Sequence, residues 1–108
     1  RQDLIYFADR AHFPYGGKSP HELTAIMRRS IRFLGGYAPS AIVMASNAPS
    51  ILVLPSLKES APVPIVGVLP PLRAAEIASC NGRVGILAVR SLVESPLPFR
   101  IRKVFVTG

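Results

Sequence analysis

Four short apolar runs, each rich in valine, isoleucine or leucine, constrain the fold of this chain more than any other feature. They cover residues 4–8, 41–45, 63–68 and 84–89. None of them alternates cleanly between apolar and polar residues, which is typical of strands covered on both faces. Segments that favour helices separate the runs. The pattern predicts an α/β domain with a parallel sheet of about four strands and helices on both faces.

The strongest helix signal lies between the first two runs. Ser19 is suited to cap a helix, Pro20 to occupy its first position, and Glu22 to complete a capping box. Apolar residues then recur at helical spacing as far as Leu34, and the Gly-Gly pair at 35–36 can end the helix. We therefore predict one long helix here, with its arginines on the opposite, solvated side.

Two shorter helices are expected further along. One follows the second run, where Pro49 suits a first turn, but Pro55 would cost about 3 kcal/mol in a helix interior. That helix should be kinked or broken at Pro55. A third is predicted over residues 72–79, before a turn at Asn81-Gly82. Residues 1–94 thus form the expected domain, and residues 95–108 form a basic and apolar tail with a possible strand.

Charge and cysteine content limit the classes of function. The 108 residues include 13 Lys and Arg against 6 Asp and Glu, a net charge of +7. This excess suggests nucleic acid, a membrane surface or an anionic small molecule as partner. No apolar run approaches the roughly 20 residues of a membrane helix. The single Cys80 excludes an internal disulfide and a multi-cysteine zinc site, and His12 and His21 show no metal-ligand pattern. We expect a cytoplasmic protein without a metal site.

Two polar segments follow the first two predicted strands, namely residues 9–19 and 46–50. The carboxyl ends of parallel strands gather at one edge of a sheet, and ligands bind there. Both segments also lead into predicted helix N-termini, where free N–H groups and the helix dipole favour a carboxylate or phosphate. A small anionic ligand is therefore expected between them.

Four stretches of the chain carry recognisable motifs, in order and at plausible spacing. They are Tyr6-Phe7-Ala8-Asp9 followed by Pro14-Tyr15-Gly16 and Lys18-Ser19, then Ala45-Ser46-Asn47-Ala48-Pro49-Ser50, Pro62 to Val68, and Gly82 to Ala88. Together they resemble the aspartate/glutamate racemase family, and glutamate racemases in particular, over roughly residues 4 to 94.

The resemblance implies inversion of the α-carbon of glutamate or aspartate without a cofactor, in a bacterial pathway that feeds peptidoglycan. Such enzymes use two cysteines, a thiolate that removes the α-proton and a thiol that returns one from the opposite face. Ser46 occupies the position of the first cysteine. The resemblance assigns substrate contacts to Asn47, to Ala48 in place of a threonine, and to the backbone of residues 14–16, which are Pro14, Tyr15 and Gly16.

The departures from the family pattern lead us to expect that this chain alone is inactive. A serine hydroxyl is too weakly acidic to supply the anionic base unaided. The family's opening strand would precede Arg1, and its second domain would supply the other cysteine. Three explanations for the serine at position 46 remain open. It is an engineered change from cysteine, the mark of a non-catalytic relative that kept the fold, or a serine that works with another base.

Two further expectations concern partners. A non-catalytic binding module that presents its basic surface to nucleic acid or another acidic partner is the alternative function. An apolar sheet edge left open by the absent strand predicts self-association or pairing with a complementing segment.

Overall fold

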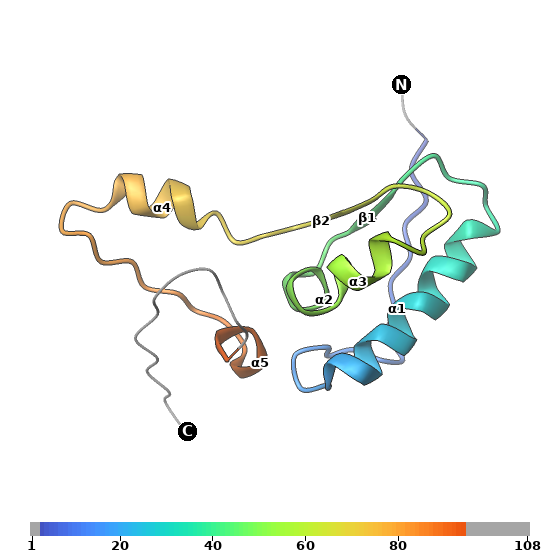
Figure 1. Ribbon diagram of the computed structural model, residues 1–108, viewed down its shortest axis with the longest axis horizontal. Coiled ribbons are helices and arrows are strands. Elements are labelled where there is room, and N and C mark those ends of the chain that lie inside the picture. The colour runs from blue at the N-terminus through green and yellow to red at the C-terminus, as the bar shows by residue number, and fades with distance from the viewer. Residues whose placement is uncertain (1–2, 95–108) are drawn as a thin grey trace.

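The computed structural model describes residues 3–94, so the strand predicted in the 95–108 tail lies outside the described residues. Two short strands and five helices are arranged along this part of the chain (Figure 1). In order they are α1 (Pro20–Gly35), β1 (Ile42–Met44), α2 (Asn47–Leu52), α3 (Leu54–Lys58), β2 (Ile65–Gly67), α4 (Leu72–Ala78) and α5 (Arg90–Val93).

The strands β1 and β2 form a parallel pair in which Ile42, Val43 and Met44 lie opposite Ile65, Val66 and Gly67. The predicted α/β class and parallel pairing are therefore confirmed for this pair. The prediction of about four strands is wrong for the described residues, where the sheet has two. Residues 4–8 and 84–89 carry no strand. A strand needs a neighbour for its backbone groups, and among the described residues neither segment is hydrogen-bonded to β1 or β2.

The predicted long helix is confirmed as α1. The hydroxyl of Ser19 accepts a hydrogen bond from the Glu22 N–H at 3.2 Å, and Pro20 occupies the first turn. The helix buries Leu23, Met27 and Ile31, which lie on one face. These signals are local, because the capping residues are within four positions of each other.

Pro55 breaks the second predicted helix into α2 and α3, as expected. The interruption falls at Val53, whose φ of −129° and ψ of −19° are not helical. Pro55 then sits in the first turn of α3. Its absent N–H costs nothing there, because first-turn N–H groups have no partner within the helix.

The hydrophobic core lies on one face of the sheet. It joins α1 to the buried strand residues and to the α2–α3 segment, through Leu23, Met27, Ile31, Ile42, Met44, Val53, Leu54, Leu57 and Ile65. On the opposite face Val43 and Val66 are 67% and 56% exposed. The prediction of helices on both faces is therefore wrong for the described part, where α1, α2 and α3 pack on a single face.

The course of the chain after β2 explains why the sheet face with Val43 and Val66 is exposed. The predicted third helix forms as α4, but it buries no residue and extends away from the sheet (Figure 1). A turn follows in which Gly82 has a φ of +69° and the Asn81 side chain accepts from the Arg83 N–H. The chain then returns to α5, which the sequence did not predict and whose Leu92 is 2% exposed and packs near α2.

Candidate functional site

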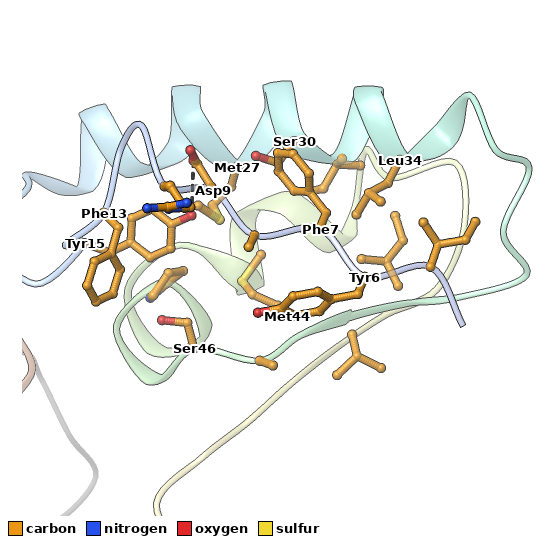
Figure 2. A pocket seen from close by; sticks show the side chains of 18 residues that line it. Tyr6, Phe7, Asp9, Phe13, Tyr15, Met27, Ser30, Leu34, Met44 and Ser46 are labelled. Atoms are coloured by element: carbon orange, nitrogen blue, oxygen red, sulfur yellow. Dashed lines mark hydrogen bonds between the residues drawn. The ribbon is translucent and has the colours of Figure 1, made fainter. Parts of the chain in front are cut away.

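A groove of about 510 Å³ runs between residues 5–10 and β1 (Figure 2). Its floor consists of side chains from α1, including Met27, Ile31 and Leu34. The polar residues gather at one end, where Asp9, Tyr15 and Ser46 lie together in Figure 2. The groove therefore brings together the two polar segments that the sequence placed at the carboxyl end of the sheet.

Asp9 is the centre of a hydrogen-bonded cluster in the 9–15 loop. Its carboxylate accepts from the backbone N–H of His12 at 3.2 Å and lies 2.9 Å from His12 Nδ1. It also accepts from the Tyr15 hydroxyl at 3.1 Å. The Asp9 side chain is only 7% exposed, whereas that of His12 is 35% exposed. The Asp9 carboxylate, at the start of the loop, is thus hydrogen-bonded to residues in its middle and at its end.

The cluster shifts the pKa of two of its members. Burial acts to raise the pKa of Asp9, but the hydrogen bonds from His12 and Tyr15 outweigh it, so the pKa lies below its ordinary 3.8. Burial also raises the pKa of Tyr15 to about 12, and the hydrogen bond to the Asp9 carboxylate and its charge add to the effect. Asp9 is therefore an anion and Tyr15 a neutral donor at neutral pH.

Ser46 lies at the carboxyl end of β1, directly before the first residue of α2, and lines the groove. Its hydroxyl makes no capping bond to α2. Within residues 3–94, no histidine or carboxylate is hydrogen-bonded to it. Among the described residues, the Ser46 hydroxyl therefore has no hydrogen-bonded base, although it lines the same groove as Asp9.

Ser50, four residues further on, has a structural role that the sequence did not reveal. Its buried hydroxyl donates to the Met44 carbonyl at 3.0 Å and accepts from the Val68 N–H at 3.1 Å. These two groups lie at the ends of β1 and β2, so one side chain on α2 links both strand ends by hydrogen bonds. The contact with Val68 spans 18 positions in the sequence, and no local pattern could have indicated it.

The other predicted site residues lie around the groove rather than on its walls. Pro14 and Asn47 are exposed, and Ala48 is buried at 7% exposure. Gly16 packs against the residue before α5, since an added Cβ would lie 2.9 Å from Val89 Cγ2. Of the predicted set, Tyr15 and Ser46 line the groove. Asp9, which ends the first motif of the resemblance, also lines the groove.

We predict that Asp9→Asn lowers the pKa of Tyr15 from about 12 towards its ordinary 10.0. The neutral amide removes the negative charge that opposes tyrosinate formation. The pKa is measured by following the Tyr15 ring resonances in an NMR titration. Glu76→Gln is the matched control, because Glu76 pairs with Arg73 on α4. An unchanged Tyr15 pKa in Asp9→Asn would show that burial alone causes the shift.

The described residues contain neither a metal-binding cluster nor a membrane-spanning helix. No group of three or more His, Cys, Asp or Glu side chains within residues 3–94 is placed to hold a metal ion. Among the described helices, none has the length and apolar character required to cross a membrane.

The fold and the groove define an α/β domain whose polar loops meet at the carboxyl end of a parallel strand, a position where such domains bind small ligands. Sequence comparison identifies the proteins it is similar to. The chain is 33% identical over 97 residues to a glutamate racemase of Deinococcus radiodurans. It is 39% identical over 108 residues to that of Proteus mirabilis and 40% identical over 96 residues to that of Carboxydothermus hydrogenoformans. The resemblance to glutamate racemases is therefore confirmed.

The similarity covers most of this chain but a small part of its relatives. The alignments include 90%, 95% and 89% of the chain, respectively, and 33%, 36% and 36% of the three racemases. The chain thus spans about a third of the length of the curated relatives it matches. No family model matches the chain. No solved structure matches it either.

Proposed function

We propose that this chain is part of a glutamate racemase-type enzyme that inverts the α-carbon of glutamate without a cofactor. The observation that carries the proposal is 39% identity to a glutamate racemase across 95% of the chain. The position of Ser46 supports it, because the residue that the resemblance places at the family's cysteine lies at the end of β1 and lines the groove. Aspartate is the competing substrate, and a cytoplasmic role in supplying D-glutamate to peptidoglycan belongs to the same proposal.

The proposed reaction needs one base and one acid on opposite faces of the substrate. The base removes the α-proton, and the acid delivers a proton from behind, so protons balance and the configuration inverts. A ligand in this groove would contact both Ser46 and Tyr15, which lie at the polar end of the groove (Figure 2). The neutral Tyr15 hydroxyl already donates to Asp9. Asp9 and Tyr15 therefore shape the polar end of the groove, and the family's substrate contacts from Pro14, Gly16, Asn47 and Ala48 remain part of the proposal.

We further propose that the chain by itself does not racemise glutamate. The Ser46 hydroxyl has no hydrogen-bonded base among residues 3–94, and His12 is bonded through Nδ1 to Asp9 instead. An unactivated hydroxyl cannot supply the required anion at neutral pH. The second catalytic group would have to come from outside this chain.

Circular dichroism of L-glutamate and L-aspartate solutions tests the proposal directly. The complete gene product with Ser46→Cys should abolish the optical activity of glutamate faster than that of aspartate, while the isolated chain should leave both unchanged. Rapid racemisation by the isolated chain would overturn the proposed inactivity. A folded complete gene product that is inactive towards both amino acids, also with cysteine at position 46, would overturn the proposed racemase function.

One observation favours a second candidate, binding to single-stranded nucleic acid. Three exposed aromatic rings form a row, with centroids 5.1 Å apart for Phe7 and Phe33 and 5.8 Å apart for Phe33 and Tyr37. Arg10 and Arg29 line a shallow hollow of about 430 Å³ together with Phe7 and Phe33. Rings for stacking beside cationic side chains are the pattern of proteins that bind single strands.

We predict for this candidate that binding of a single-stranded RNA oligonucleotide weakens with added salt. The slope of log K against log salt concentration should be about −0.7 for each phosphate contact. Fluorescence anisotropy measures it, and Arg29→Ala should make the slope shallower. Arg73→Ala is the control, because Arg73 lies on α4 and pairs with Glu76 at 3.0 Å. Equal slopes for both variants would remove this surface as the binding site.

A further inference from the structure

The turn after α4 holds the side chain of Asn81 folded back along the chain that follows it. The Asn81 Oδ1 accepts a hydrogen bond from the Arg83 N–H at 3.0 Å, the pattern by which asparagine side chains stabilise turns. This bond closes a ring of atoms that contains both the side-chain carbonyl carbon, Cγ, of Asn81 and the backbone nitrogen of Gly82. The turn therefore holds an amide carbon and a nitrogen nucleophile in one small loop.

The carbonyl oxygen of the Asn81 side chain lies among hydrogen-bond donors. Besides the Arg83 N–H, the hydroxyl of Ser79 lies 3.3 Å from Oδ1 and 2.9 Å from the Arg83 carbonyl, so its single proton has two acceptors within reach. When a nucleophile adds to Cγ, negative charge develops on Oδ1. Donors that are already aimed at that oxygen stabilise the charge, so the turn favours addition at Cγ.

The Gly82 nitrogen is accessible for that addition. Asn81 and Gly82 are both exposed. Gly82 has no Cβ to shield its nitrogen, it has a φ of +69°, and an added Cβ would find nothing within 4 Å. Among the described residues, the Gly82 N–H donates no hydrogen bond. Solvent hydroxide can therefore reach and remove its proton.

Asn47, the other asparagine of the chain, lacks these features. It is the first residue of α2, and the nitrogen that follows it belongs to Ala48, which carries a Cβ and is 7% exposed. The helical backbone also fixes the geometry at this position. Asn47 is thus an internal reference with the same side chain in an unsuitable setting.

We propose that Asn81 is a site of spontaneous deamidation and that its turn accelerates the reaction. The deprotonated Gly82 nitrogen forms a bond to Cγ, the bond from Cγ to the side-chain nitrogen breaks, and that nitrogen leaves as ammonia with a proton from water. Water then opens the cyclic succinimide at either carbonyl, which gives aspartate or isoaspartate. Nothing is oxidised or reduced, and water is the only co-reactant.

The products change both the charge and the backbone of this segment. Each event replaces a neutral amide by a carboxylate and lowers the net charge of +7 by one. In isoaspartate the main chain passes through Cγ, so the connection from α4 to the chain that returns to α5 gains a carbon atom. The turn lies away from the sheet (Figure 1). The proposal is therefore independent of the racemase function and of the groove.

Peptide mapping of the full chain, incubated folded at mildly alkaline pH, tests the proposal. Trypsin releases residues 74–83 with Asn81 and residues 33–58 with Asn47. The first peptide should acquire the mass of an acid in place of an amide and separate into aspartate and isoaspartate forms, faster as pH rises. The second should stay unchanged, as should both peptides of an unincubated sample digested alongside. Conversion at Asn47 as fast as at Asn81 would overturn the proposal.

The contribution of the turn is measured by repeating the incubation in guanidinium chloride. The folded chain should deamidate about tenfold faster than the unfolded chain, the factor that one neutral hydrogen bond contributes. Ser79→Ala should lower the folded rate towards the unfolded one. Ser60→Ala is the matched control and should leave the rate unchanged, because the Ser60 hydroxyl lies near the Leu57 carbonyl, 3.5 Å away, at the end of α3. A folded rate equal to or below the unfolded rate would overturn the proposal.

Discussion

Replacing Ser46 by cysteine in the complete gene product is expected to raise the rate of glutamate racemisation by about 10²- to 10⁴-fold, the range that a positioned acid–base group contributes. A cysteine thiol has an ordinary pKa of about 8.5, so part of it is thiolate near neutral pH, whereas a serine hydroxyl supplies no anion there. Position 46 borders the groove directly before α2. The new thiol would therefore contact a ligand at the position that the resemblance assigns to the family's cysteine.

Ser30→Cys is the matched control for this prediction. Ser30 also lines the groove, but it lies on α1. A thiol there should leave the rate unchanged, because the rate depends on the position of the base relative to the α-carbon. The rates are followed by the loss of circular dichroism of L-glutamate. Equal effects of the two substitutions would contradict a specific role for position 46.

Replacing Leu57 by alanine is expected to lower the free energy of unfolding by about 2–5 kcal/mol. Leu57 is 1% exposed and belongs to the core that joins α1, the strands and α3. The substitution removes apolar contacts and leaves a cavity under the sheet. Because small domains have only about 5–15 kcal/mol of stability in total, this loss is a large fraction of it.

Urea denaturation followed by the helical circular dichroism signal measures this loss. Leu69→Ala makes the same chemical change at a side chain that is 70% exposed. It should change the free energy of unfolding by no more than about 0.5 kcal/mol, as is usual for surface positions. Similar losses for both variants would mean that α3 does not anchor the core as the structure indicates.

Elements with short-range signals were predictable from sequence. The cap and apolar spacing of α1 lie within the helix itself, and Ser19 makes the bond that its position predicted. Pro55 divides α2 from α3 because of its own covalent structure. Ser46 was located by resemblance, and its place on the groove agrees with a site at the carboxyl end of β1.

Contacts made by an irregular loop, and elements that require a distant partner, were not predictable in the same way. The hydroxyl of Ser50 is hydrogen-bonded to both Met44 and Val68. The Asp9 carboxylate is hydrogen-bonded to His12 and Tyr15, which the loop conformation brings close to it. Neither contact follows a periodic pattern. The short helix α5 also had no signal, and it packs through Leu92 near α2, far from it in sequence.

The sequence by itself determined which segments of this protein favour helix or extended backbone, because those preferences depend on caps, prolines and side-chain branching within a few residues. Only the tertiary structure decided which extended segments became strands. Residues 42–44 and 65–67 found each other and paired, whereas the equally apolar residues 4–8 face β1 across an open groove. A helix satisfies its backbone internally, but a strand exists only when another segment supplies the hydrogen bonds.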